Sequence, residues 1–129
     1  MPDFHLPFPE ATFESLERPL GPLPEEILHP LDVFFQTAAA SLRYAMVGRH
    51  GWSLVDSFRG LALANAIGLW TLRLACGERS PEVQDMSRVV MMLDRGLTYD
   101  SMLGRRHQLR IVGLARKHEL ARLVVWYAR

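Results

Sequence analysis

Cysteine is almost absent from this chain, because Cys76 is the only one among its 129 residues. A single cysteine forms no intramolecular disulfide, and it cannot supply a zinc or iron–sulfur site built from cysteines alone. We therefore expect no disulfide framework. A reducing, cytoplasmic compartment fits this composition best.

Long apolar runs and export signals are also missing. The most apolar stretch lies between Arg59 and Arg73. As a helix this stretch is about 20 Å long. It is therefore shorter than a membrane-spanning helix, which has roughly 20 residues and a length of about 30 Å. The first residues, MPDFHLPFPE, carry Asp3 and prolines where a secretory signal has positive charge and then an apolar run. We expect neither a transmembrane segment nor an export signal.

Hydrophobic residues, in contrast, are plentiful. They make up 49% of the chain and charged residues 22%, which is typical of a folded globular protein. A chain of 129 residues is long enough to bury one core and too short for two. The composition therefore predicts a single folded unit.

Proline is concentrated at the beginning of the chain, with seven of the eight prolines in the first thirty residues. Proline disfavours long helices, so residues 1–30 are expected to form a proline-rich, acidic arm, with a short helix at 11–18. The arm is too apolar for a free linker, and we expect it to lie along the helical body or along a partner. Its candidate docking residues are Phe4, Phe8 and Phe13.

Residues 31–129 are expected to form an all-α domain, a bundle of about four helices around a central one. The first helix is predicted from about Leu31 to Val47. The central helix is predicted at 53–76, with Ser53 as N-cap and a stop at Gly77. A third helix is predicted to start at Ser80-Pro81-Glu82 and to end near Gly96.

The last segment, 105–129, is predicted to be one helix, or two helices broken near Gly113 or around Arg116-Lys117. A change of apolar spacing there suggests the break. The expected inner face of this segment consists of Leu109, Val112, Leu120, Leu123, Val124 and Tyr127.

The central helix is apolar on nearly every side, which is the pattern of a helix surrounded by others. Gly60, Ala64 and Gly68 recur at intervals of four residues and form a smooth stripe. Such a stripe lets another backbone approach closely, and the alanines at 38–40 are the expected partner. Tight packing in the core is the favoured interpretation.

No set of residues indicates catalysis, a metal or a cofactor. Glu26 and His29 have the Glu-x-x-His spacing of di-metal bundles, but the motif occurs once, and Pro30 biases His29 away from helix. No two histidines are three or four residues apart, the spacings with which one helix chelates zinc. Cys76 is expected to be a small packed residue, since no second cysteine can resolve its oxidation.

Charge of opposite sign separates along the chain. Residues 1–40 hold seven acids against Arg18, a balance of −6, whereas residues 104–129 hold seven bases against Glu119, a balance of +6. The two ends are able to pair with each other, and the basic end is also suited to phosphates or an acidic partner. Its candidate binding residues are Arg105, Arg106, Arg110, Arg116, Lys117 and Arg122.

Three stretches carry a resemblance to a known family. They are Gly51-Trp52-Ser53-Leu54-Val55-Asp56-Ser57-Phe58-Arg59, Asp94-Arg95-Gly96-Leu97-Thr98-Tyr99 and Leu123-Val124-Val125-Trp126-Tyr127. From about Leu31 onward the chain resembles the helical C-terminal region of the cysteine-cluster family that includes flagellin lysine-N-methylase-like proteins. The cluster of that family is absent here, so its chemistry does not carry over. The resemblance implies a freestanding helical module, or the split partner of a cluster-bearing chain, and in both cases docking.

The sequence thus favours a non-catalytic helical interaction module, an accessory subunit that docks onto a partner protein. The alternative is a small nucleic-acid-binding subunit that contacts phosphates through the arginines of 104–129. An enzyme with a buried cofactor is a third class, for which the residues give no acid, base or nucleophile. Association of identical copies stays open.

Overall fold

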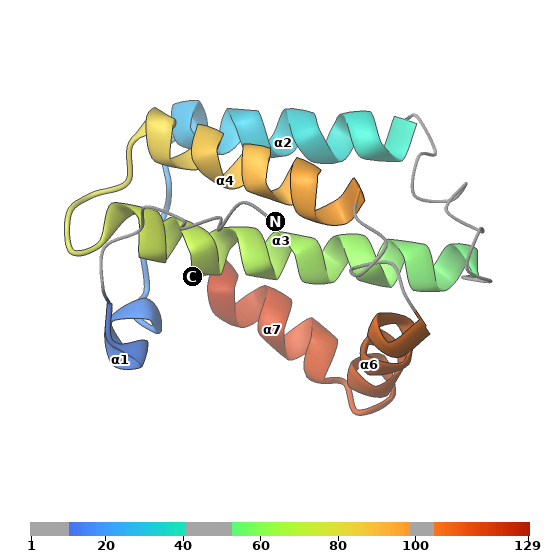
Figure 1. The fold of residues 1–129 in the computed structure, drawn as a ribbon. Helices are drawn as coiled ribbons and strands as arrows, with labels where there is room; N and C mark the ends of the chain where they lie inside the picture. The colour runs from blue at the N-terminus through green and yellow to red at the C-terminus, as the bar shows by residue number, and fades with distance from the viewer. Residues whose placement is uncertain (1–10, 41–52, 99–104) are drawn as a thin grey trace, which may run out of the picture.

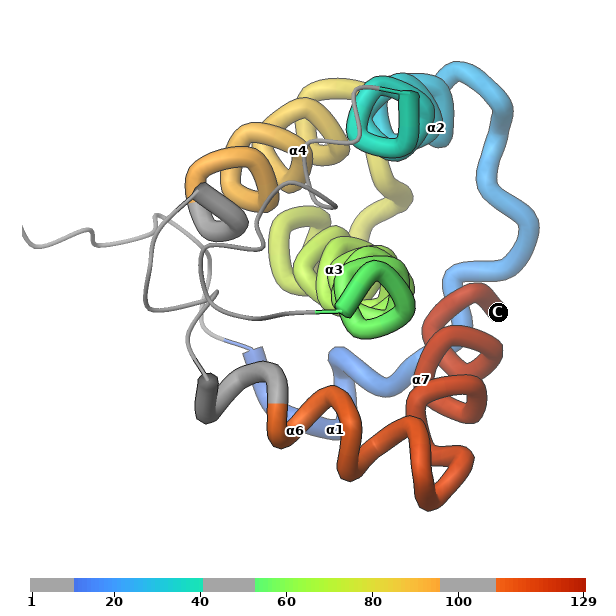
Figure 2. The backbone as a smooth tube through the Cα atoms, turned by 90° about the vertical axis from the view of Figure 1, so that its right-hand side faces the viewer, coloured from blue at the N-terminus to red at the C-terminus, as the bar shows by residue number. Residues whose placement is uncertain are grey.

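The computed structural model describes residues 11–40, 53–98 and 105–129, and these residues contain helices and no strand. The longest helix, α3, lies in the middle; α2 and α4 lie on one side of it, and α6 and α7 on the other (Figures 1 and 2). The predicted all-α bundle around a central helix is confirmed. The helices are α1 (Phe13–Leu16), α2 (Glu25–Ala40), α3 (Leu54–Cys76), α4 (Val83–Thr98), α6 (Arg105–Arg116) and α7 (Glu119–Ala128).

The predicted ends of α3 are confirmed. Ser53 caps the start, because its side chain accepts a hydrogen bond of 3.1 Å from the N–H of Asp56. Gly77 ends the helix with a φ of 60°, a backbone conformation that suits glycine, and donates its N–H to the Arg73 carbonyl. Within the described part of the chain, no helix is long and apolar enough to traverse a bilayer.

Helix α2 begins at Glu25, six residues before the predicted start at Leu31, and Pro30 lies inside it. Residues 25–30 are therefore helical, although the sequence analysis assigned them to the proline-rich arm. The tendency of proline to end a helix is outweighed here because Ile27 and Leu31, one turn apart, are both buried in the core. The predicted continuation of this helix to Val47 lies outside the described residues.

Helix α4 begins at Val83, two residues later than the expected first helical residue, Pro81. The cap is also different: the buried Asp85 carboxylate accepts the N–H of Glu82 at 2.9 Å, where Ser80 was expected to cap. Arg79 holds this carboxylate with two hydrogen bonds of 2.7 Å, and these bonds lower the pKa of Asp85. A carboxylate fixed in this way caps the helix more strongly than a free hydroxyl does.

Of the stripe expected to pack closely, Ala64 and Gly68 are buried and Gly60 is part-buried. At Gly68 the nearest neighbours are not the expected alanines at 38–40. A Cβ placed on Gly68 meets Leu93 at 3.0 Å, Val89 at 3.6 Å and Leu31 at 3.7 Å. Bulky side chains of α4 and α2, and not the alanines at 38–40, therefore fill the space beside Gly68.

The last segment forms two helices, and the predicted break around Arg116-Lys117 is confirmed. His118 separates them with a left-handed backbone, φ 58°. Because this residue resets the direction of the chain, α6 and α7 do not share one continuous inner face. Leu120 is buried as expected, but Leu109 is 61% exposed, whereas Ile111 of α6 is fully buried.

Replacement of Gly68 by valine should lower the free energy of unfolding by about 1–3 kcal/mol, because overpacking a filled core costs that much. Gly113→Ala in α6 is the matched control, since nothing lies within 4 Å of the added Cβ. It should raise stability by roughly 0.5–1 kcal/mol, because alanine favours helix over glycine. Urea unfolding followed by circular dichroism measures both, and an unaffected Gly68→Val protein would contradict the close packing.

Candidate docking groove

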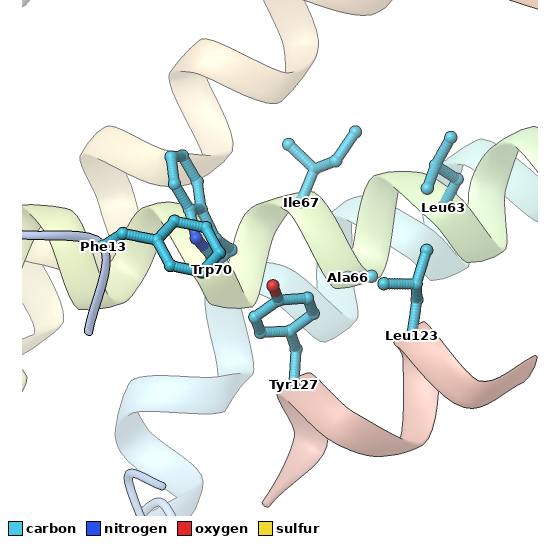
Figure 3. Close-up of a pocket in the computed structure, with 7 residues that line it drawn as sticks. All are labelled: Phe13, Leu63, Ala66, Ile67, Trp70, Leu123 and Tyr127. Carbon is cyan, nitrogen blue, oxygen red and sulfur yellow. The ribbon is translucent and has the colours of Figure 1, made fainter. Parts of the chain in front are cut away.

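An open, apolar groove of about 270 Å³ lies between α1, α3 and α7 (Figure 3). One face of α3 forms its floor, because residues three and four positions apart point the same way on a helix. Two residues of α7, one turn apart, form a wall. The lining residues are Phe13, Leu63, Ala66, Ile67, Trp70, Leu123 and Tyr127.

Aromatic side chains mark the end of the groove near α1. Phe13 and Trp70 both line the groove (Figure 3). Phe13 is nevertheless 71% exposed, although α1 is held in place by the Thr12 side chain, which accepts the Ser15 N–H. Trp126, on the rim side of α7, is also exposed. A small protein that leaves two large aromatic side chains in solvent beside an apolar groove has the features of an interaction surface.

Glu17 fixes the aromatic rim. Its carboxylate accepts a hydrogen bond of 2.6 Å from the Tyr127 hydroxyl and another of 2.6 Å from the Trp126 indole. Burial, followed by the bond to Glu17, raises the pKa of Tyr127 to about 12. The Arg129 guanidinium stacks on the Trp126 ring, 3.3 Å from its centre. These contacts hold the two rings of α7 beside the groove.

Arg73 joins α3 to the arm and to the end of α7. It is 1% exposed and donates to the carbonyl of Arg18 at 2.8 Å and to that of Tyr127 at 3.2 Å. Its remaining hydrogen bonds go to the carbonyls of Leu69 and Arg129. Burial lowers the pKa of Arg73, and the charge of Glu17 opposes this shift. A buried guanidinium is thus satisfied mainly by backbone oxygens.

Arg18 makes the reciprocal contact. Its guanidinium donates to the carbonyls of Gly77, Glu78 and Arg79, where α3 ends. A cation at that position is favourable because the C-terminus of a helix carries partial negative charge. The Leu20 N–H also donates to the Arg129 carbonyl at 2.9 Å. The described part of the arm therefore lies along the helical body, one of the two placements expected from sequence.

The predicted pairing of the acidic and basic ends takes a different form. Glu17 meets the C-terminal helix through Tyr127 and Trp126, and Arg129 reaches only the Glu17 carbonyl. Between the described side chains of 11–40 and 109–129, no ion pair joins an acid of the first range to a base of the second.

The basic residues singled out from sequence lie outside the groove. Arg110, Arg116 and Lys117 are exposed along α6 and its end, and Arg122 is exposed and pairs with Glu119 at 3.1 Å. Arg105 and Arg106 lie in the first turn of α6, where only the backbone is described. Of the expected arm residues, Phe13 lines the groove, whereas Phe4 and Phe8 lie outside the described residues.

Sequence reasoning missed Arg73 and Glu17 as residues that build the site. One signal for Arg73 was present: it stands between Leu72 and Leu74 in a helix that is apolar on nearly every side, so its side chain is buried on any orientation of that helix. Glu17 gave no local signal, because its partners lie more than one hundred positions away in the chain.

The groove is suited to bind apolar side chains. Its polar atoms are the hydroxyl of Tyr127, which is already bonded to Glu17, and the indole N–H of Trp70. Over residues 11–40, 53–98 and 105–129, no group of three or more His, Cys, Asp or Glu side chains comes together to hold a metal. What the groove offers a ligand is apolar surface between fixed aromatic rings.

Arg73→Met should lower the free energy of unfolding by about 3 kcal/mol, because buried carbonyl groups without a donor cost roughly 1–3 kcal/mol each. The free energy of unfolding of Arg73→Lys should lie between those of wild type and Arg73→Met, because lysine keeps the charge but not the planar fork of donors. Arg88→Met on the exposed side of α4 is the control, with an expected change within about 0.5 kcal/mol. Equal urea midpoints for Arg73→Met and Arg88→Met would contradict the role of Arg73.

The raised pKa of Tyr127 predicts a change of stability at alkaline pH. The pKa rises from 10.0 in the unfolded chain to about 12 in the fold, so the folded protein binds this proton more tightly. The stabilisation is complete below pH 10 and is lost as the pH rises to 12. Tyr127→Phe has no such proton, so the stability difference between wild type and variant should shrink over that range. A constant difference in urea unfolding would contradict the assignment.

Comparison with known proteins adds no relative, since no family model, curated protein or solved structure matches the chain. The resemblance to the helical region of the cysteine-cluster family therefore stays a prediction.

Proposed function

We propose that this chain is a non-catalytic helical docking module that binds an acidic, amphipathic segment of a partner protein, as an accessory subunit of a cytoplasmic assembly. The observation that carries the proposal is the open apolar groove between α3 and α7, whose rim Glu17 and Arg73 hold in place. The cysteine-cluster resemblance makes a cluster-bearing chain one candidate for the partner.

The dimensions of the groove suit two or three anchoring side chains. Its floor runs from Trp70 to Leu63, seven residues of α3 or about 10 Å. Two turns of a partner helix, or a short extended segment, present apolar side chains over that length. Each leucine- or phenylalanine-sized side chain that leaves water there contributes roughly 1.5–3 kcal/mol. Since the rim is already fixed, binding requires little reordering of this chain.

The surrounding charge favours an acidic partner. Arg59 lies one turn of α3 before Leu63, and its half-exposed side chain pairs with Asp56 at 3.1 Å. Helix α6 packs against both α3 and α7, and Arg110 and Arg116 are exposed on it. Carboxylates that flank the apolar anchors of a partner are thus attracted to this side of the molecule. Charge complementarity speeds association and selects against basic partners.

The test is a peptide selection against the full chain from a random display library, followed by calorimetry of the best peptide. We expect acidic peptides with aliphatic or aromatic anchors. Leu63→Gln should weaken such a peptide at least about tenfold, because a polar side chain in the groove forfeits the burial of one anchor. Leu54→Gln is the matched control: Leu54 is in the same helix, exposed, and not part of the groove.

Equal losses in Leu63→Gln and Leu54→Gln, or a selection without acidic and apolar residues, would contradict the proposal. Nucleic-acid binding is the second candidate, favoured by the exposure of Arg110, Arg116 and Lys117 along α6 and directly after it. This alternative predicts that an oligonucleotide binds both leucine variants equally well and that its affinity falls steeply with salt. That result would support nucleic-acid binding and contradict the docking module. Light scattering during the titrations detects a second copy of the chain.

A further inference from the structure

We propose that the outer face of α7 binds the surface of an anionic phospholipid bilayer, separately from the groove. Four exposed residues define this outer face: Arg122, Val125, Trp126 and Arg129. The last three stand three, four and seven positions after Arg122, so all four share one side of the helix. The inference goes beyond the docking module, because it assigns a second surface with a different ligand.

The outer face points away from the groove. Val125 is two positions from both Leu123 and Tyr127, which form the groove wall. A helix turns by about 100° per residue, so Val125 lies on the opposite side of α7 from that wall. Val125 is 72% exposed, and no large apolar side chain in the described part of the chain is more exposed. Helix α7 is thus apolar on its outer side as well, where a helix that only covers a core is polar.

Arginines flank the apolar residues of the outer face at both ends. Arg122 comes one turn before Val125, and its side chain is 76% exposed. It pairs with Glu119 at 3.1 Å, but an ion pair in solvent is weak and leaves the guanidinium accessible. Arg129 comes one turn after Trp126 and stacks on its ring.

Positive charge continues beyond the outer face. Arg116 and Lys117 are exposed at the turn that leads into α7. Glu119 is the one Asp or Glu among residues 104–129, so it cannot neutralise these bases and Arg122 together. A surface with this charge attracts an anionic layer over distances of about 10 Å.

Trp126 is held in a position from which it can enter an apolar layer. Its indole N–H donates to the Glu17 carboxylate at 2.6 Å. Because this N–H already has a partner, the ring leaves water without an unsatisfied donor. Glu17 also accepts the hydroxyl of Tyr127, and the charge of Arg73 offsets part of its own. The ring is therefore fixed before any ligand arrives.

The interface of an anionic bilayer satisfies both kinds of side chain on this face. Lipid phosphates attract the guanidiniums, the acyl boundary accepts Val125, and tryptophan is enriched at that depth. A nucleic acid would bind the arginines but would leave Val125 without a use, since phosphates and base edges need polar partners. A second copy of the chain would bring arginines of the same sign together. Charge and exposed apolar surface together thus favour lipid.

The experiment measures sedimentation of the full chain with vesicles of phosphatidylcholine and phosphatidylglycerol, and with vesicles of phosphatidylcholine alone. We expect binding to the anionic vesicles only, and weaker binding as salt rises. Arg122→Gln should lower the partition coefficient about fivefold, the contribution of one base near an anionic surface. Val125→Gln should lower it at least about threefold, because an apolar side chain no longer leaves water on binding.

Two matched controls lie on the other side of α3, in α4 and α2 (Figure 1). Arg88→Gln removes the same charge from an exposed position of α4, and Val33→Gln makes the same change from apolar to polar on α2. Both should bind the anionic vesicles within about twofold of wild type, because their positions face away from the membrane and are screened by salt. Urea midpoints near that of wild type should confirm that each variant folds, since every substituted side chain is exposed.

Three results would overturn the inference. They are absence of binding to the anionic vesicles, equal losses in Arg122→Gln and Arg88→Gln, and no loss in Val125→Gln. An oligonucleotide that loses as much affinity in Val125→Gln as the vesicles do would assign the outer face to nucleic acid instead. Leu63→Gln should bind vesicles like wild type, and the selected peptide should bind Val125→Gln like wild type. Failure of the lipid contact and failure of the docking groove are therefore distinguishable.

Discussion

The fold depends on a buried charge in the last turn of an apolar helix, α3. Arg73 lies among leucines, and a guanidinium removed from water costs several kcal/mol unless its N–H groups are satisfied. Its partners are carbonyls of Arg18, Leu69, Tyr127 and Arg129, three of them outside α3. The arm and the end of α7 must therefore stay against the C-terminal half of α3. A hydrophobic residue at this position would leave these carbonyls without a donor and would impose no such geometry.

The groove is a consequence of this constraint. Arg73 donates to the backbone carbonyl of Tyr127, and Glu17 accepts a hydrogen bond from its hydroxyl, so the Tyr127 side chain is fixed in the wall of the groove. Leu63 and Ile67 of α3 line the groove, and Phe13 is mostly exposed. Polar contacts at one end of the bundle thus hold an apolar surface open next to them. A rim made of packed side chains alone would tend to collapse onto that surface.

Local features of the fold were predictable from the sequence, and non-local ones were not. Ser53 and Gly77 define α3 through contacts within a few residues, and the break near Lys117 follows from a change in apolar spacing. The start of α2 was misplaced because Pro30 was weighed by its local preference, whereas burial of Ile27 and Leu31 decides the outcome. The groove joins α1 to α7 across almost the whole chain, and no spacing rule within one segment reveals such a contact.

The charges of the described helices indicate which kind of ligand suits the groove. Among the described side chains of 11–40 and 109–129, the acids of the first range and the bases of the second form no ion pairs with each other, although the chain is nearly neutral overall. A fold that used these charges for its own stability would bring them together, as Arg79 and Asp85 are brought together. Arg110 and Arg116 on α6, and Lys117 directly after it, are instead exposed, and α6 packs against the two helices that form the floor and the wall of the apolar groove. The partner segment proposed above, with large apolar side chains and carboxylates beside them, is complementary to both features.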